Sequence, residues 1–264
     1  MIECFNEDCL QGMVKRLDEG AVSVIVTSPP YNLGIDYGIY DDHITREKYL
    51  DWLVDISRGF YRVLAEDGSI FLNMGSKPTD PMVPFDVLNV FLRSFELQNV
   101  FHWIKSISVE TEEAVCSYGH YKPINSPRFV NDCHEYIFHL TKHGKTPLDR
   151  LAIGVPYKDK ANVERWGGTK TDARCRGNCW FIPYETIQSR DKDRPHPATF
   201  PAALPELCMK VHGTQRIKLA LDPFLGLGNS AIAAQKLGVP FLGFEIDPTY
   251  YEAARGALKC LDAA

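Results

Sequence analysis

The chain alternates between short apolar runs and longer stretches in which apolar residues recur every three or four positions. Residues 1–6 lean apolar and indicate a short strand, and the apolar run at 21–26 ("AVSVIV") indicates a buried strand. Between residues 45 and 64 the apolar spacing of three and four predicts an amphipathic helix. A strand and a second helix are predicted next, at 69–74 ("SIFLNM") and 87–97.

The same alternation continues towards the C-terminus after one interruption. Residues 143–194 lose periodicity and collect Gly, Pro, Arg and Lys, which indicates an insertion or a small subdomain. The other predicted elements are two strands and then helix, strand, helix, strand and helix, at 100–109, 135–140, about 202–212, 217–222, 230–238, 240–247 and from Tyr250 onward. Strands that alternate with helices predict a parallel α/β sheet with helices on both faces.

Length and composition limit the class of protein. The 264 residues suffice for one large domain or one and a half, and no stretch approaches the ~18 consecutive apolar residues of a membrane span. The N-terminal "MIECFNEDCL" lacks the basic-then-apolar order of a signal peptide. Eight scattered cysteines indicate reduced thiols in a cytosolic or nuclear setting. Cys175 and Cys179 lack a second pair at ligand spacing, so no metal is expected.

The charge of the chain is distributed unevenly. The net charge is −5, from 29 Lys and Arg against 34 Asp and Glu, which argues against a protein that coats nucleic acid. Residues 142–194 hold 12 basic and 7 acidic residues, so this segment carries +5 and the rest of the chain −10. A basic segment on an acidic body suits a protein that meets a polyanion with one face. A solvated, irregular insertion explains the charge equally well.

The segment "LDPFLGLGNSAIAAQKLG" (221–238) combines a strand end, a glycine turn and a helix start. Gly226 and Gly228 permit close approach of the backbone to a ligand, and the helix N-terminus presents free N–H groups. Glu245, 17 residues after Gly228, ends the next strand, where a carboxylate accepts hydrogen bonds from ribose hydroxyls. Together these features predict an adenosine-type cofactor. Ala231 fills the place of the third glycine of G-x-G-x-x-G, so this stretch does not exclude NAD.

A second segment, "TSPPYNLG" (27–34), ends the apolar run before it in an unusual way. Pro29 and Pro30 donate no hydrogen bond to a sheet and fix their own φ, so the strand must end there in a stiff turn. Both proline carbonyls are expected to stay free to accept hydrogen bonds, with Ser28 and Tyr31 held beside them. Taken alone, these four residues are also explained by a rigid turn at a sheet edge.

The two segments together resemble the amino-methyltransferases of DNA, which pair a D-P-F-x-G-x-G cofactor loop with an [S/D/N]-P-P-[Y/F/W] catalytic loop. Here "SPPY" comes first and "DPFLGLG" last, which is similar to the permuted β group of the family. The resemblance covers most of residues 1–142 and 195–255. It implies an α/β, Rossmann-like S-adenosylmethionine-dependent methyltransferase fold, circularly permuted and seven-stranded, with a small inserted target-recognition region.

The resemblance also implies which residues bind S-adenosylmethionine. "FNEDC" is similar to the family's third motif, whose acid, here Asp8, faces the adenine. "RPHPATFPAALP" resembles the segment that closes over the methionine end, although a local turn constraint explains His196 equally well. Leu227 departs from the family, which usually has a small or polar residue there. The implied cofactor-binding residues are Asp8, Thr27, His196, Phe200, Asp222, Phe224, Gly226, Gly228, Asn229, Ser230 and Glu245.

Residues 143–194 match nothing general, as expected of the part of such an enzyme that recognises the DNA sequence. The candidate contacts to double-stranded DNA are Arg165, Lys170, Arg174 and Arg176. Trp166 and Trp180 either contact DNA by stacking or form the aromatic core of a folded insertion. The chain is therefore divided into a catalytic half, a target-recognition insertion and a cofactor-binding half of the same domain, at 1–142, 143–194 and 195–264.

A catalytic hypothesis explains the proline turn. An exocyclic amino nitrogen of cytosine or adenine is a poor nucleophile, because its lone pair is delocalised into the ring. The Ser28 hydroxyl oxygen and the Pro29 carbonyl, in a turn stiffened by Pro30, accept hydrogen bonds from that amino group and favour a tetrahedral nitrogen. Tyr31 offers a face on which an extruded base stacks. In the family, serine at the first motif position usually accompanies N4 of cytosine, so we expect a cytosine-N4-specific DNA methyltransferase.

Other functions stay open at this point. The Ser28 oxygen and the Pro29 carbonyl together form a clamp for the amino group. Aspartate or asparagine at the first motif position usually accompanies N6 of adenine, and N6-adenine methylation by the same clamp is the main alternative. Methylation of an amide or amino nitrogen in protein or RNA, a catalytically silent DNA-binding regulator and an NAD oxidoreductase are the others. The expected partner is double-stranded DNA, with no membrane, and a homodimer and a cognate restriction endonuclease are left open. The expected location is the cytoplasm, with the nucleoid, or the nucleus if the source is eukaryotic.

Overall fold

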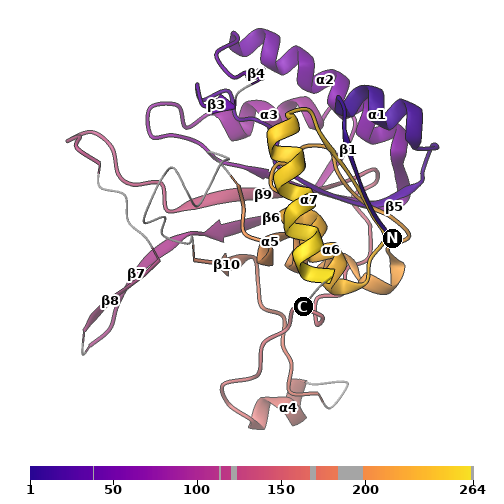
Figure 1. The fold of residues 1–264 in the computed structure, drawn as a ribbon. Coiled ribbons are helices and arrows are strands. Elements are labelled where there is room, and N and C mark those ends of the chain that lie inside the picture. The colour runs from indigo at the N-terminus through magenta and orange to yellow at the C-terminus, as the bar shows by residue number, and fades with distance from the viewer. Residues whose placement is uncertain (38, 113, 120–123, 167–170, 184–198, 263–264) are drawn as a thin grey trace.

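The computed structural model describes residues 1–37, 39–112, 114–119, 124–166, 171–183 and 199–262, which form a central β-sheet between two layers of helices (Figure 1). The strands of the main sheet are β1 (Ile2–Asn6), β2 (Val22–Thr27), β5 (Leu64–Met74), β6 (Glu96–Ile104), β9 (His134–Thr141), β10 (Cys179–Phe181), β11 (Ala220–Asp222) and β12 (Phe241–Glu245). The helices are α1 (Cys9–Arg16), α2 (Arg46–Val63), α3 (Val83–Phe91), α4 (Ala161–Trp166), α5 (Ala203–His212), α6 (Asn229–Leu237) and α7 (Pro248–Asp262), with a 3-10 turn at Thr214–Arg216.

Within the described residues the main sheet has eight strands, in the order β1-β12-β11-β2-β5-β9-β6-β10. Neighbouring strands are parallel from β1 to β5 and between β6 and β10, whereas β9 is antiparallel to both of its neighbours. The expectation of an entirely parallel sheet is therefore wrong at β9. The described residues between β6 and β9 form a hairpin instead of a crossover helix, and a chain that returns in this way pairs antiparallel. The eighth strand, β10, comes from the insertion and extends the expected seven.

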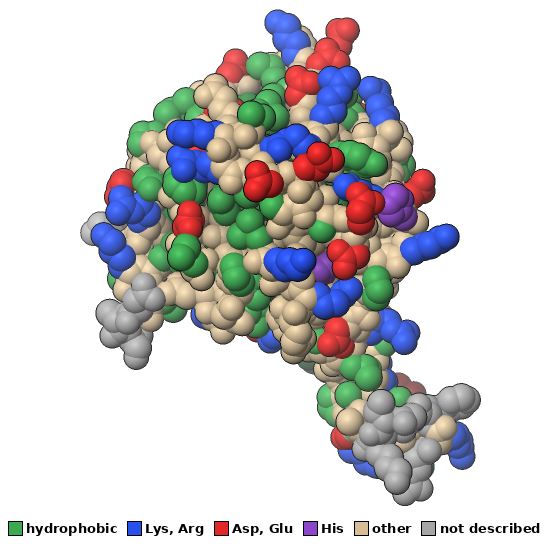
Figure 2. Space-filling model, turned by 90° about the vertical axis from the view of Figure 1, so that its right-hand side faces the viewer, with side chains coloured by type: hydrophobic (Ala, Val, Ile, Leu, Met, Phe, Trp, Pro, Cys, Tyr) green, Lys and Arg blue, Asp and Glu red, His purple; other side chains and the backbone are tan. Residues whose placement is uncertain are grey.

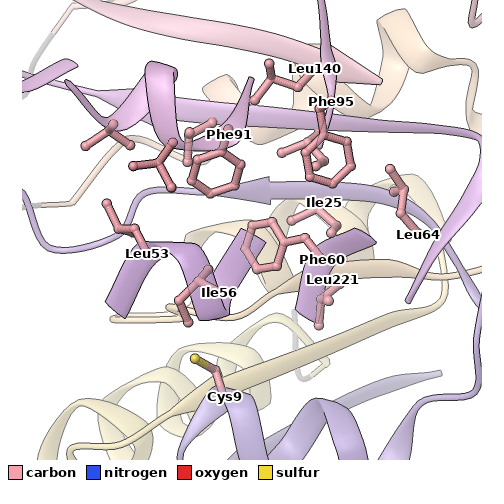
Figure 3. Close-up of a cluster of buried hydrophobic side chains, with 14 of the residues drawn as sticks. Cys9, Ile25, Leu53, Ile56, Phe60, Leu64, Phe91, Phe95, Leu140 and Leu221 are labelled. Atoms are coloured by element: carbon pink, nitrogen blue, oxygen red, sulfur yellow. The ribbon is translucent and has the colours of Figure 1, made fainter. Parts of the chain in front are cut away.

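The two faces of the sheet contribute to two hydrophobic cores. Ile25 of β2 belongs to the core that the sheet forms with α1, α2 and α3, whereas the adjacent Val24 belongs to the core with α5, α6 and α7. Figure 3 shows part of the first core, where the rings of Phe60 in α2 and Phe91 in α3 have centroids 5.8 Å apart. Because β2 is buried along its whole length, apolar residues of this strand point to both faces of the sheet.

Local chemistry sets the helix ends and changes two expectations. α3 begins at Val83, earlier than predicted, because Pro84 is favoured in the first turn of a helix. It also ends earlier, since residues from Glu96 onward pair with β9 as strand β6. The apolar pattern does not predict α1, which is capped by Asp8: the backbone N–H of Gln11 donates to Asp8 Oδ1 at 3.0 Å.

Two segments project from the body. The strands β7 (Ser106–Glu110) and β8 (Val115–Gly119) form an antiparallel hairpin that is mostly exposed (Figure 1). The insertion carries α4 on a second extension, which reaches below the body in Figures 1 and 2.

A short antiparallel pair, β3 (Asp36–Tyr37) and β4 (Tyr40–Asp41), precedes α2. In the described part of the chain, no helix has both the length and the apolar character that a membrane span needs.

Candidate active site

A cleft of about 680 Å³ opens at the edge of the sheet where the parallel strands end. The segments that follow β1, β2, β5, β11 and β12 form its walls, together with the start of β9, which reaches this edge because β9 runs antiparallel. Ligands of open α/β sheets bind at this edge. Ten residues predicted from the sequence line the cleft: Asp8, Ser28, Pro29, Pro30, Tyr31, Phe200, Phe224, Gly226, Asn229 and Glu245.

The glycine turn forms one wall of the cleft. Gly226 and Gly228 have φ angles of 52° and 82°, in the left-handed region that favours glycine. Helix α6 begins directly after Gly228, as the sequence predicted within a residue. Asn229, its first residue, donates from Nδ2 to the Phe200 carbonyl at 2.8 Å. This bond ties the turn to the segment that precedes α5, so both walls of this part of the cleft are fixed together.

Glu245 lies at the end of β12 and is 8% exposed. Its Oε2 accepts a hydrogen bond from the backbone N–H of Gly226 at 2.7 Å, and its Oε1 accepts one from Asp247 at 2.9 Å. A carboxylate has about four acceptor positions, so about two remain for the ribose hydroxyls of a bound nucleoside. Burial raises the pKa of Glu245 to about 7. Donors from a ligand would favour the ionised form, so the site fits the adenosyl half of the expected cofactor.

Four predicted cofactor residues lie beneath the cleft instead of on its wall: Thr27, Asp222, Gly228 and Ser230. Asp222 is fully buried; its Oδ1 accepts from Thr27 Oγ1 at 2.6 Å, and its Oδ2 accepts from Ser230 Oγ at 2.5 Å. Burial raises the pKa of Asp222 to about 6. Because Thr27 ends β2 and Asp222 ends β11, this bridge holds the catalytic segment against the cofactor turn.

The catalytic segment, Ser28 to Tyr31, begins immediately after β2. The carbonyl of Pro30 accepts a hydrogen bond from Tyr49 Oη at 2.6 Å, so the expectation that both proline carbonyls stay free is wrong for Pro30. Tyr49 comes from α2 and is fully buried, which makes this bond a fixed support of the turn. Among the described residues no hydrogen bond to the Pro29 carbonyl is formed. Ser28 Oγ lies 2.7 Å from Tyr31 Oη.

A polar cluster surrounds the hydroxyl of Tyr31, whose side chain is almost buried. Tyr31 Oη lies 3.0 Å from Glu135 Oε2 and 2.7 Å from Asn73 Nδ2. Lys105 Nζ donates to the other carboxylate oxygen, Glu135 Oε1, at 3.0 Å. A Cβ atom on Gly75, the residue directly after β5, would lie 2.8 Å from the Tyr31 ring, so the backbone approaches this ring more closely there than any other residue type would permit.

Three further residues of the site were not predicted from the sequence: Asn73, Glu135 and Lys105. A signal exists for two of them, since Asn73 interrupts the apolar run "SIFLNM" near its end and Glu135 begins the run "EYIFHL". Trp52 was also missed. It lines the cleft, and its ring centroid lies 5.5 Å from that of Phe224. Its spacing in α2 is that of an ordinary core aromatic, so nothing in the sequence marks it.

The basic residues of the insertion lie away from the cleft. Arg165, Arg174 and Arg176 are exposed and none of them lines it. Arg176 Nε donates to the Ile153 carbonyl at 2.9 Å, so this side chain also supports the local fold of the insertion. Lys170 and His196, which were also predicted as site residues, lie outside the described residues.

The aromatic and cysteine residues of the insertion have clear environments. Trp180 is 1% exposed and its ring centroid lies 4.5 Å from that of Phe101 in β6. Trp180 therefore belongs to the core and not to a DNA-stacking surface, whereas the side chain of Trp166 lies outside the described part of the structure. Cys175 and Cys179 are both exposed free thiols. The part of the chain that the structure describes contains no group of three or more potential metal ligands.

Comparison with known proteins identifies the family. The sequence profile of the N6/N4 methyltransferases, described as DNA methylase, matches residues 22–256 and therefore most of the chain. The chain belongs to this DNA methylase family. The type II methyltransferase M.HpaI of Haemophilus parainfluenzae is 29% identical over 250 residues, which cover 93% of this chain and 70% of that protein. The DNA adenine methyltransferase YhdJ of Escherichia coli K12 is 26% identical over 255 residues, which cover 95% and 80%.

Solved structures of DNA methylases share the fold. The cytosine-N4-specific PvuII DNA methyltransferase superimposes with a TM-score of 0.69 at 19% identity, over 96% of this chain and 84% of that one. The complex of M1.HpyAVI with S-adenosylmethionine gives a TM-score of 0.59 at 17% identity, over 97% of this chain and 100% of that one. At these identities the likeness shows the fold alone. The Rossmann-like methyltransferase fold expected from the sequence is confirmed.

The family assignment decides several of the alternatives. The resemblance to the DNA amino-methyltransferases is confirmed, and with it S-adenosylmethionine as the cofactor of the family. The enzyme is a DNA methyltransferase, so DNA is its substrate, and the NAD oxidoreductase allowed by the glycine pattern is excluded. The known relatives include an adenine enzyme, and a cytosine-N4 enzyme shares the fold, so the family alone does not choose the base.

Proposed function

We propose that this DNA methyltransferase methylates the exocyclic N4 amino group of cytosine. The observation that carries the proposal is the placement of Ser28 and Pro29 on the wall of the cleft, at the first two positions of the catalytic motif. Serine at the first position is what the resemblance associates with cytosine N4. N6-adenine methylation by the same residues is the second candidate, because a relative of this chain is an adenine methyltransferase.

The two acceptors act on the nitrogen that receives the methyl group. The Ser28 hydroxyl oxygen and the Pro29 carbonyl accept hydrogen bonds from the two N–H groups of the target amino group. These hydrogen bonds favour a tetrahedral nitrogen whose lone pair is no longer delocalised into the ring. Because the Pro30 carbonyl accepts a hydrogen bond from the buried Tyr49, the two acceptors are held in place before the base arrives. S-adenosylmethionine supplies an electrophilic methyl group when it is bound, and Glu245 with the Gly226 turn would hold its adenosyl half.

The target base must leave the double helix to reach these acceptors. The cleft is lined by aromatic side chains that can stack on an extruded base, among them Tyr31 and Trp52. We assign recognition of the DNA sequence to residues 143–194 because of their positive charge and the exposed Arg165 and Arg174. The proposal also includes a cytoplasmic enzyme that acts on the DNA of the nucleoid. A homodimer and a cognate restriction endonuclease stay open.

The test is a single-turnover assay of methyl transfer from labelled cofactor to DNA, with the product nucleoside identified by mass spectrometry. The Ser28→Ala variant removes one acceptor and leaves the turn, so its rate should fall on the order of 10²- to 10³-fold. Ser76→Ala is the matched control, because Ser76 lines the same cleft and its Oγ bonds Asp132 instead, at 3.4 Å.

Two outcomes would contradict the proposal, and they differ. A Ser28→Ala enzyme that is as fast as the Ser76→Ala control would show that the Ser28 oxygen is not needed as an acceptor. A product that contains N6-methyladenine would leave the clamp in place and overturn the choice of cytosine. The expected product of the unaltered enzyme is N4-methylcytosine. The affinity of Ser28→Ala for the cofactor should be unchanged, because Ser28 belongs neither to the Gly226 turn nor to the strand end at Glu245.

A further inference from the structure

The hydroxyl of Ser28 has a neighbour that decides where its proton points. Ser28 Oγ lies 2.7 Å from Tyr31 Oη, and either oxygen can donate at that distance. The difference matters for the clamp. If Ser28 donates to Tyr31, its oxygen lone pairs face the cleft, whereas if Tyr31 donates to Ser28, the serine proton is free to point at the target amino group and repel it.

The surroundings of Tyr31 choose between these two states. Tyr31 Oη has one proton and lies 3.0 Å from Glu135 Oε2, and an ionised carboxylate can only accept. Asn73 Nδ2 lies 2.7 Å from Tyr31 Oη and can only donate to it. The single proton of Tyr31 therefore goes to Glu135. Ser28 is then left to donate to Tyr31, and its own oxygen becomes an acceptor.

Glu135 is itself held firmly. Lys105 Nζ donates to Oε1 at 3.0 Å, and Asn73 Nδ2 donates to Oε2 at 2.7 Å. The Glu135 side chain is 14% exposed, so its bonds to a charged group are largely shielded from water. Gly75 lets it stand beside the Tyr31 ring, because a Cβ there would lie 3.1 Å from Glu135 Cδ.

We propose that Glu135 is a positioning residue for methyl transfer, which acts through Tyr31 to keep the Ser28 oxygen an acceptor for the target amino group. The inference rests on the proposed function of Ser28. It assigns a role to the Tyr31 hydroxyl that differs from stacking, which needs only the ring. It also explains why a carboxylate at the start of β9 lies at the floor of the cleft.

The main test is Tyr31→Phe, which keeps the ring and removes the hydroxyl. The single-turnover rate of methyl transfer should fall about 10- to 100-fold, the range expected for a hydrogen bond that ends on a charged group. The dissociation constants of S-adenosylmethionine and DNA should stay within about twofold of the unaltered enzyme. Tyr61→Phe is the matched control, since Tyr61 is an exposed tyrosine of α2 that packs against Phe95.

Glu135→Gln tests the other end of the chain of bonds. An amide keeps the size of the side chain but supplies only one acceptor oxygen, so the rate should fall while the dissociation constants again stay within about twofold. Glu66→Gln is its control, because Glu66 is an exposed carboxylate that pairs with Lys142 and His143. Circular dichroism and thermal unfolding of each variant identify any that fails to fold, and Tyr31→Phe then carries the test alone.

A double-mutant cycle with Ser28→Ala separates positioning from general damage to the site. If Tyr31 and Glu135 act through the Ser28 oxygen, then Tyr31→Phe should slow the Ser28→Ala enzyme by less than about threefold. An equal loss from Tyr31→Phe in both backgrounds would overturn the positioning role and leave the clamp intact. A Tyr31→Phe enzyme at full speed would overturn it too. A Ser28→Ala enzyme at full speed would instead overturn the proposed function, and this inference with it.

Discussion

At the scale of single residues, the turn that carries Ser28 depends on one buried hydroxyl. Tyr49 is fully buried and its Oη donates to the Pro30 carbonyl at 2.6 Å. Tyr49→Phe keeps the ring and deprives that carbonyl of its donor, so the free energy of unfolding should fall by about 1–3 kcal/mol. Methyl transfer should slow while cofactor affinity stays the same. Urea unfolding beside a single-turnover assay measures both, with Tyr61→Phe on the same helix as the control; equal stability of the two variants would contradict the support role.

Residues with a local signature could be identified from the sequence. Gly226, Gly228 and Glu245 are recognised by a turn, a helix start and a strand end within a short segment, and the structure places them as that pattern requires. Glu135 has no such signature. In a sheet with all strands parallel, the first residue of the strand "EYIFHL" would lie at the opposite edge from the cleft. Only the antiparallel direction of β9 brings Glu135 to Tyr31, and that direction depends on the topology of the whole sheet.

At the scale of elements, strand β10 attaches the insertion to the edge of the sheet. Strand β10 pairs with β6, and Trp180 packs on Phe101, so this part of the insertion is fixed to the sheet. Loss of periodicity marked the insertion in the sequence, but the three-residue strand inside it is too short to show a pattern. The residues of β6 that pair with β10 lie 77 positions earlier in the sequence. The long regular pattern of α2, by contrast, located this helix within one residue at each end.

The exposed arginines of this insertion carry the prediction at this scale. Reversing the charge of both Arg165 and Arg174 should weaken DNA binding and reduce the slope of log affinity against log salt, by about one for each lost phosphate contact. Arg176 is left unaltered because it supports the insertion through the Ile153 carbonyl. Cofactor affinity should not change. Arg58→Glu on the exposed face of α2 is the control, and an equal effect of this variant would place recognition elsewhere.

At the scale of the whole molecule, segments from both ends of the chain form one sheet. Strand β1 pairs with β12 over five residues, and Thr27 bonds Asp222 across 195 positions of sequence. The catalytic segment and the cofactor turn are thus parts of one cooperative structure. The assignment of these halves to one domain, with limits at 1–142, 143–194 and 195–264, stays a prediction. Stability and cofactor binding should therefore be coupled.

Four buried titratable groups with large pKa shifts change the free energy of unfolding in opposite directions as the pH falls. Burial lowers the pKa of His139 to about 3 and that of His212 to about 4, and it raises those of Asp222 to about 6 and Glu245 to about 7. As the pH falls below ~6.5, only the unfolded chain protonates the two histidines, which lowers the free energy of unfolding. Over the same range only the folded chain protonates the two acids, which raises it. The two pairs oppose each other, so their combined effect between about pH 5 and 6.5 should be nearly zero in the cofactor-free enzyme.

Binding of S-adenosylmethionine should remove that balance. Ribose hydroxyls that donate to Glu245 favour its ionised form, so the loaded enzyme holds one proton fewer and the histidines are no longer fully offset. The free energy of unfolding should then rise with pH by about 1.4 kcal/mol per unit between about pH 5 and 6.5, against a nearly flat profile without cofactor. Urea unfolding at several pH values, with and without saturating cofactor, measures both slopes. Cofactor-free Glu245→Gln lacks the same proton and should reproduce the slope of the loaded enzyme, whereas a flat profile in that variant would show that Glu245 does not set the balance.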